Sequence, residues 1–217
     1  QCFSSSDALS RVIDIVRKIT LEGDIEEGFS LEEKYPDTLD LRPNIFTYDD
    51  CFLQILEENN ILNFIESIVG VRLFLSHVQL RVAYPSSIGP DRSYMEWHRD
   101  THFYQGVVRG NVPPVHKIIF YPDVYGSEEQ VLGIVEGSHL RVSKDKSSDY
   151  RDLGDSSIKI IKTSNSKYVL FNTLAMHSTL PVSADREMGI PRLIYNFCIK
   201  RQLEKYPDRP ILRGSDD

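Results

Sequence analysis

The sequence predicts a mainly β protein with flanking helices. Beyond Gly70 the chain consists of short runs of β-branched and aromatic residues separated by turn residues, with no helical pattern between them. Before Gly70 the apolar residues instead repeat at helical spacing. Several short strands in succession favour an antiparallel barrel or sandwich over an alternating α/β fold. We therefore expect helices at the start of the chain and a β core after them.

Two helical regions are expected before the β core. The first helix has Ser5, Ser6 and Asp7 as possible N-caps and ends at Gly23, and its apolar positions are Leu9, Val12, Ile13, Val16 and Ile19. A polar, proline-containing loop is expected from there to about Thr47. The second region, Asp49 to Gly70, is either two short helices or one helix interrupted near Asn59 and Asn60. Both regions could cover one face of a sheet.

Six runs are predicted as strands: Val71–Tyr84, Lys117–Asp123, Gln130–Val135, Ser157–Thr163, Lys167–Asn172 and Arg192–Lys200. The first of these alternates in polarity. Its polar face carries His77, Gln79 and Arg81, and its apolar face carries Val78, Leu80 and Val82. The polar face either lines a cavity or faces solvent, because a one-residue slip in register exchanges the two faces. The sequence leaves both possibilities open.

Length and composition bound the domain organisation. The 217 residues are enough for a sizeable core, and no linker-like stretch divides them, so we expect a single domain over 1–217. Within it, 1–70 form a mainly helical part that packs on the β core of 71–200. A hydrophobic content of 41% with 26% charged residues is ordinary for a soluble globular protein.

Charge and cysteine usage limit the partners and the compartment. A net charge of −7 without a basic run disfavours nucleic acid as a partner, although a demethylase acting on bases is compatible with this charge.

No apolar stretch approaches the roughly 18 residues of a membrane span, and no targeting segment opens the chain. Because the chain begins at Gln1, we expect a native N-terminus, with any leader, to be missing. Cys2, Cys51 and Cys198 have no paired spacing, which favours reduced thiols and a cytoplasmic protein.

The motif Trp97-His98-Arg99-Asp100 indicates a metal site. Successive side chains of a strand point to opposite faces, so His98 and Asp100 share a face and Arg99 points away. His177, directly after an apolar run, is the candidate third ligand. Two imidazoles and one carboxylate on one side of an ion leave the opposite positions open, which is the arrangement of non-heme Fe(II) oxygenases.

A candidate anion-binding residue follows the third ligand. Arg192 opens an apolar strand, and a planar guanidinium at a strand mouth suits bidentate capture of a carboxylate. Arg186 is the alternative, but it lies between Asp185 and Glu187 in a turn-like segment. We prefer Arg192 because it abuts the strand.

Taken together, these motifs resemble the phytanoyl-CoA dioxygenase (PhyH) family of iron- and 2-oxoglutarate-dependent oxygenases. The resemblance spans roughly Val71 to Lys200 and rests on the order His98-x-Asp100, then Val135-Glu136-Gly137-Ser138-His139, then His177 and Arg192. It implies a double-stranded β-helix core of the jelly-roll, cupin-like type. It also implies that His98, Asp100 and His177 bind iron and that Arg192 binds the far carboxylate of 2-oxoglutarate. Thr179 stands where family members often have a serine that contacts the same carboxylate.

The resemblance implies a hydroxylase whose catalytic residues are these three metal ligands. Its cofactors would be Fe(II), 2-oxoglutarate and dioxygen, with ascorbate as a possible reductant, and its products succinate, carbon dioxide and a small organic molecule hydroxylated at an unactivated C–H. Halogenases of the family lack the carboxylate ligand, which is present here as Asp100. Desaturation, ring closure and a cupin-like binding protein without activity remain alternatives. Substrate, substrate-binding residues and oligomeric state are not predicted.

The remaining histidines receive other roles. His102, Phe103, Tyr104 and Gln105 belong to a loop expected to cover the substrate, and His102 could also compete as a ligand. His77, His116 and His139 are expected to be structural, the last in a Gly-Ser turn.

Overall fold

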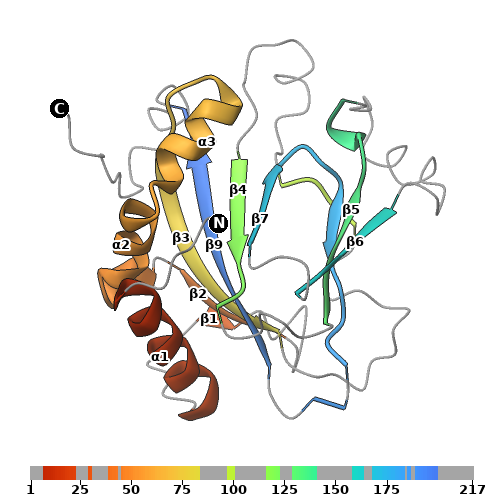
Figure 1. Ribbon diagram of the computed structural model, residues 1–217. Coiled ribbons are helices and arrows are strands. Elements are labelled where there is room, and N and C mark those ends of the chain that lie inside the picture. The colour runs from red at the N-terminus through yellow and green to blue at the C-terminus, as the bar shows by residue number, and fades with distance from the viewer. Residues whose placement is uncertain are drawn as a thin grey trace.

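In the part of the chain that the structure describes, three α-helices pack on one of two facing antiparallel sheets, as a computed structural model shows (Figure 1). The structure describes residues 7–22, 29–30, 39–43, 45–83, 97–100, 116–122, 129–140, 158–163, 168–183, 185–186 and 189–199. The predicted covering loop with His102 and Phe103 lies outside these residues.

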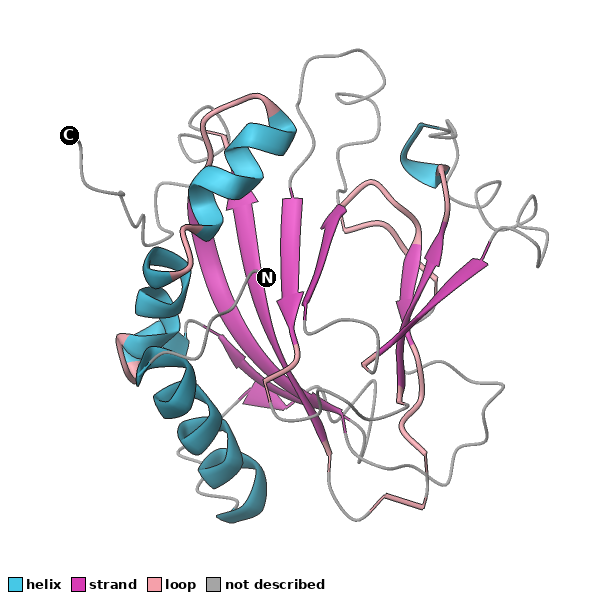
Figure 2. Cartoon of the chain, in the orientation of Figure 1, coloured by secondary structure: helices cyan, strands magenta, loops and turns pink. Residues whose placement is uncertain are grey.

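The larger sheet has six strands and the smaller one three (Figure 2). The order in the larger sheet is β1 (Phe29–Ser30), β2 (Leu39–Pro43), β3 (Phe74–Ala83), β9 (Ile190–Cys198), β4 (His116–Phe120) and β7 (Tyr168–Asn172). The smaller sheet is ordered β6 (Ile158–Lys162), β5 (Gln130–Val135) and β8 (His177–Thr179). All these pairings are antiparallel, which confirms the predicted mainly β architecture.

The predicted helices form close to their expected bounds. They are α1 (Asp7–Glu22), α2 (Cys51–Glu58) and α3 (Ile61–Val69), with short 3-10 helices η1 (Ile45–Thr47) and η2 (Ser138–Leu140). The second region is two helices, because Asn60 adopts a left-handed φ of 51° between them. Gly70 then ends α3 at a φ of 77°, a conformation that costs glycine little.

One sequence prediction before the core is wrong. The stretch expected to be a loop up to Thr47 contains β1 and β2, which extend the larger sheet beyond β3. In β2, Leu41 pairs with Arg81 of β3 and the strand ends at Pro43. The local sequence of these short segments has little strand character, so pairing with β3 rather than intrinsic propensity accounts for them.

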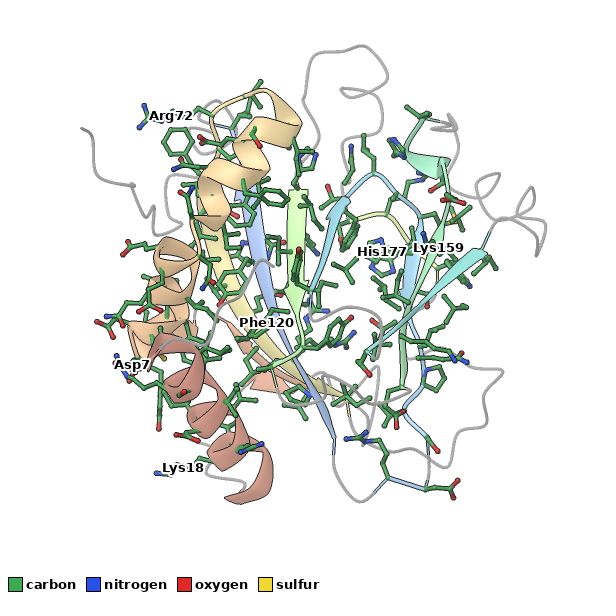
Figure 3. The ribbon with its side chains drawn as sticks, in the orientation of Figure 1. Asp7, Lys18, Arg72, Phe120, Lys159 and His177 are labelled. Carbon is green, nitrogen blue, oxygen red and sulfur yellow. The ribbon has the colours of Figure 1, made fainter. Side chains whose placement is uncertain are left out.

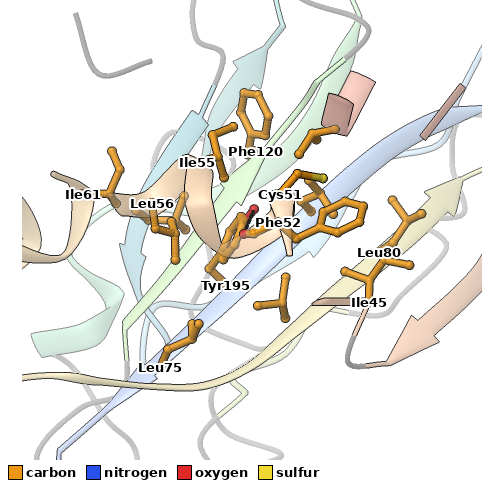
Figure 4. Close-up of a cluster of buried hydrophobic side chains, with 14 of the residues drawn as sticks. Ile45, Cys51, Phe52, Ile55, Leu56, Ile61, Leu75, Leu80, Phe120 and Tyr195 are labelled. Atoms are coloured by element: carbon orange, nitrogen blue, oxygen red, sulfur yellow. Dashed lines mark hydrogen bonds between the residues drawn. The ribbon is translucent and has the colours of Figure 1, made fainter. Parts of the chain in front are cut away.

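The larger hydrophobic core lies between the helices and the outer face of the larger sheet. Phe52 and Ile55 of α2 are fully buried there in one cluster with Leu80 and Tyr195 (Figure 4). Ile65 of α3 belongs to the same cluster and is also fully buried. Each such side chain contributes about 1.5–3 kcal/mol by leaving water. The helices cover one face of the sheet, as their apolar periodicity indicates, and the opposite face is left for the second sheet.

The inner face of the larger sheet forms a second core with the smaller sheet. The residues that pack there include Ile119 of β4, Tyr121 directly after β4, Phe171 of β7, Ile194 of β9 and Leu132 of β5. The inner face is therefore the one that meets the other sheet, and it is the face on which the chemistry described below is found.

The structure shows which face of β3 is directed toward the helices and which toward the second sheet. Val78, Leu80 and Val82 are buried in the core under the helices. Gln79 and Arg81 lie on the opposite face of β3. Ala83, on that same face, belongs to the core between the sheets. The polar face of β3 thus lines the space between the sheets rather than facing solvent.

Among the described residues, no helix combines the length and the apolar character needed to cross a membrane.

Asp49 links the first two helices, and its loss is expected to destabilise the fold in a pH-dependent way. Its Oδ1 accepts hydrogen bonds from the Cys51 N–H at 2.8 Å and from Arg11 at 2.6 Å. The Cys51 N–H is the largest influence that lowers the pKa of Asp49 from 3.8 to about 2. Because the folded pKa is depressed, this contribution is complete above the unfolded value and is lost as the pH falls toward 2. Asp49→Asn should cost about 1 kcal/mol at neutral pH.

Urea unfolding of Asp49→Asn and the wild type at pH 7, 4 and 2 checks this expectation. The difference in unfolding free energy should shrink between pH 4 and pH 2, because protonation removes the charge that the substitution removes. A difference that stays constant down to pH 2 would show that the carboxylate charge does not matter at this position.

Candidate metal centre and anion-binding face

The three predicted metal ligands converge. The ligand atoms of His98, Asp100 and His177 all lie within 4.8 Å of one another. The distance from His98 Nε2 to Asp100 Oδ1 is 3.4 Å, and His177 Nε2 lies 3.2 Å from Asp100 Oδ2. Among the described residues, this is the group of histidine, cysteine and acidic side chains with the geometry to share one ion.

Backbone pairing brings these residues together from distant parts of the sequence. The His98 N–H donates to the His177 carbonyl at 3.0 Å, and the His177 N–H donates back at 2.9 Å. His98 thereby forms an antiparallel bridge with β8 beside the smaller sheet. The Asp100 N–H donates to the Thr173 carbonyl at 3.1 Å, which fixes the carboxylate next to the same segment.

The backbone of its own segment orients the His177 ring. Its Nδ1 lies 2.9 Å from the Ala175 carbonyl oxygen, which can only accept, so Nδ1 is the donor in this contact and Nε2 is the ring atom that faces Asp100. Its ring packs edge-on against Phe171 of the opposite sheet, with centroids 4.8 Å apart. His177 therefore projects into the space between the sheets (Figure 3). A carbonyl that holds the second ring nitrogen is a common support of metal-binding histidines.

Arg99 points away from the cluster, as predicted, and supports it from behind. It is buried and donates to the Ser138 carbonyl at 2.8 Å and to the Leu174 carbonyl. The Ser138 hydroxyl in turn donates to Val135 and accepts from the Met176 N–H. The Gly-Ser-His turn thus ties the segment of His98 to the segment of His177.

Trp97 packs on the outside of the smaller sheet. A Cβ added at Gly133 would lie 2.7 Å from the Trp97 ring, so only a glycine leaves room for the indole. Gly133 pairs with Ser178 in β8, the neighbour of His177. The indole therefore covers the outer face behind the cluster.

Lys117 contacts the cluster, although the sequence did not single it out. Its Nζ lies 2.7 Å from Asp100 Oδ2, and its side chain is largely buried. Burial acts to raise the pKa of Asp100, but the Lys117 charge and the contacts with His177 and His98 outweigh it and hold that pKa well below its usual range. The carboxylate is therefore ionised at neutral pH, which metal binding requires. The available signal was a lysine in the apolar strand Lys117-Ile118-Ile119-Phe120.

Arg192 and Thr179 face the same space. The Arg192 Nη1 donates to the Thr179 hydroxyl at 2.5 Å, and both residues are buried. This bond joins β9 of the larger sheet to β8 of the smaller one. The alternative residue, Arg186, instead forms an ion pair with Glu129 at 3.1 Å.

Positive charge concentrates on the inner face next to the cluster. Arg81 is the direct register partner of Arg192 across β3 and β9. Burial lowers the pKa of Lys117, Asp100 opposes this, and the charges of Arg81 and Arg192 lower it further. Three cationic side chains therefore lie within mutual electrostatic reach beside the candidate ligands. Such a face favours an anionic ligand.

The other described histidines lie outside the cluster. His77 Nδ1 contacts the Ser76 hydroxyl at 3.0 Å, and His116 begins β4 opposite Asn172 and Phe197. His139 lies in η2, the turn that contains Ser138. None of the three belongs to the group that could share an ion.

No protein-family model matches this chain, and no curated protein matches it. The resemblance to the PhyH family in particular therefore stays a prediction. Solved structures do match over most of the chain. The non-heme alpha ketoglutarate dependent epimerase SnoN from nogalamycin biosynthesis is 12% identical, with a TM-score of 0.66 over 90% of this chain and 75% of that chain.

Two further solved structures give the same result. HygX from Streptomyces hygroscopicus, solved with nickel, 2-oxoglutarate and hygromycin B bound, is 13% identical, with a TM-score of 0.60 over 92% of this chain and 81% of its own. EvdMO1 is 17% identical, with a TM-score of 0.62 over 91% of this chain. The chain shares their fold. The double-stranded β-helix core is thereby confirmed, and the chain spans 46% of the length of EvdMO1.

Proposed function

We propose that this double-stranded β-helix protein is an Fe(II)- and 2-oxoglutarate-dependent oxygenase that hydroxylates an unactivated C–H of a small organic molecule. The observation that carries the proposal is the convergence of His98, Asp100 and His177 beside the buried Arg192–Thr179 pair. Neither feature alone would suffice, because a metal triad is compatible with many reactions and a buried arginine with many anions. Their combination on one inner face supports a metal and a dicarboxylate bound side by side.

The donor set fits a ferrous ion. Two imidazole nitrogens and one carboxylate are the ligands of the facial triad, which leaves coordination positions for other molecules. The Ala175 carbonyl contacts Nδ1 of His177 and leaves Nε2 to face the other two donors, and the Lys117 charge favours the ionised form of Asp100 next to it. When bound, the iron would supply the activation of dioxygen. The chain's own residues hold the ligand atoms in place and exclude water by burial.

The cationic face fits 2-oxoglutarate, which carries two carboxylates. Arg192 and Thr179 would hold the carboxylate far from the metal, the guanidinium by its charge and the hydroxyl by a hydrogen bond. This pair also fixes how far the cosubstrate reaches from the metal ligands, because both residues are buried on facing strands. Solved structures with this fold contain the same combination, as in SnoN with Fe3+ and alpha ketoglutarate and HygX with nickel and 2-oxoglutarate.

Hydroxylation is the outcome that we favour. Overall, 2-oxoglutarate, dioxygen and R–H yield succinate, carbon dioxide and R–OH, so that the cosubstrate and the substrate each receive one oxygen atom. Asp100 would supply the carboxylate ligand that halogenases of the resembled family lack. Epimerisation is the second candidate, because SnoN is an epimerase of the same fold. Dioxygen consumption with an unhydroxylated, stereochemically inverted product would identify it.

The proposal is tested by succinate release. The purified protein is incubated with Fe(II), 2-oxoglutarate, ascorbate and air, and succinate is measured with and without each component. We expect slow release that requires both iron and 2-oxoglutarate even without the substrate. Binding of 2-oxoglutarate without any succinate, in the presence of a panel of small molecules, would instead identify a binding protein that has lost catalysis.

A further inference from the structure

Tyr121 lies on the inner face directly beside Arg192. It follows β4, whose last register pair joins Phe120 to Leu193 of β9. The next position in the same antiparallel register places Tyr121 opposite Arg192. Arg192 therefore has Arg81 beside it on one neighbouring strand and Tyr121 on the other. Tyr121 is fully buried in the core between the two sheets.

The Tyr121 hydroxyl makes no hydrogen bond within the part of the chain that the structure describes. A buried hydroxyl without a partner is costly, because folding removes it from water without compensation. Burial raises the pKa of Tyr121, although the nearby Arg192 charge opposes the shift. The hydroxyl is therefore protonated at neutral pH and available as a donor.

A second buried tyrosine, Tyr195, offers a comparison, because its hydroxyl has a hydrogen-bond partner within the protein. Tyr195 of β9 is equally buried, but it points to the other face of the sheet, into the core under the helices. Its hydroxyl donates to the Phe52 carbonyl at 3.0 Å (Figure 4). The two tyrosines thus differ in their partners: the Tyr195 hydroxyl has an internal acceptor, whereas the Tyr121 hydroxyl has none among the described residues.

We propose that Tyr121 donates a hydrogen bond to the far carboxylate of 2-oxoglutarate, together with Arg192 and Thr179. The inference rests on the proposed function and adds a residue that distinguishes dicarboxylates from 2-oxo acids without a second carboxylate. The Tyr121 hydroxyl has no acceptor among the described residues, and the bound carboxylate would provide one. Removal of the hydroxyl should therefore harm binding but not the stability of the ligand-free fold.

The test compares Tyr121→Phe with the wild type in Mn(II), which avoids turnover. Affinity and melting temperature are measured with 2-oxoglutarate and with 2-oxopentanoate, which has the same carbon chain but a methyl end. We expect the melting temperature of ligand-free Tyr121→Phe to equal or exceed that of the wild type. Its affinity for 2-oxoglutarate should fall roughly 10-fold or more, as for a lost hydrogen bond to a charged group, and that for 2-oxopentanoate should not change.

Tyr195→Phe is the matched control. It should lower the melting temperature, because the Phe52 carbonyl loses its donor, and should leave the affinity for 2-oxoglutarate unchanged. The inference alone is overturned if the wild type binds 2-oxoglutarate and Tyr121→Phe binds it equally well, or if Tyr121→Phe is destabilised as Tyr195→Phe is. Absence of 2-oxoglutarate binding by the metal-loaded wild type would overturn the proposed function and this inference with it.

Discussion

Asp100→Ala is expected to abolish 2-oxoglutarate-dependent succinate release. The substitution removes the carboxylate that contacts both His98 Nε2 and His177 Nε2, so the two imidazoles lose the anionic member of the set. Loss of a supporting residue around a metal typically costs about 10–100-fold in affinity, and loss of a ligand should exceed this. We expect the affinity for Mn(II) to fall by more than about 100-fold, as measured by titration in the absence of oxygen.

The same substitution should also destabilise the ligand-free fold. Lys117 is buried with its Nζ 2.7 Å from Asp100, and the charges of Arg81 and Arg192 already oppose its ammonium. Removing one partner of a buried ion pair costs about 3–5 kcal/mol, because an uncompensated charge is left inside. Urea unfolding of Asp100→Ala should show a loss of this size, whereas His98→Ala should lose metal affinity with a smaller effect on stability.

A double variant separates the two effects of Asp100. In Asp100→Ala/Lys117→Met no buried ammonium remains, so much of the lost stability should return. Metal affinity should not return, because the ligand is still absent. If the double variant recovered metal affinity together with stability, Asp100 would act through folding alone and would not be a ligand.

The sequence predicted most of the strands of the core because their composition is distinctive. The runs that form β3 to β7 and β9 combine β-branched and aromatic residues with bounding turn residues, and each was predicted within a few positions of its observed bounds. Strand β8 was missed because His177–Thr179 is three residues long and polar, so it has no periodicity to detect. Strands β1 and β2 were missed because their pairing with β3 is a tertiary effect.

The site was predicted in part, because some of its residues belong to a recognisable motif and others do not. His98, Asp100 and His177 carry a metal-ligand pattern in their residue types and order, so their convergence could be anticipated. Lys117 and Tyr121 carry no motif, and their roles depend on which face of β4 points inward. A single sequence does not fix that parity, since a one-residue shift reverses it. For the same reason, the sequence does not determine whether the polar face of β3 is directed to solvent or to the space between the sheets.

Arg192→Met is the second change expected to have a large effect. It removes a buried guanidinium that donates to Thr179 on the facing sheet, and a methionine of similar length keeps the space filled. Truncating a buried, hydrogen-bonded charge that binds an opposite charge costs about 2–5 kcal/mol, or roughly 30-fold or more in affinity. Calorimetric titration of the Mn(II)-loaded variant with 2-oxoglutarate should show this loss, with the affinity for Mn(II) itself unchanged.

Arg186→Met is the matched control, because it removes the same charge from the other arginine that the sequence offered. Arg186 forms its ion pair with Glu129, whereas Arg192 lies on the inner face with Arg81 and Thr179. We expect Arg186→Met to bind 2-oxoglutarate as the wild type does. The reverse pattern, with affinity lost in Arg186→Met and kept in Arg192→Met, would move the anion site away from the inner face. The cationic cluster around Lys117 would then need another ligand, and the distance between metal and cosubstrate would no longer be set by β8 and β9.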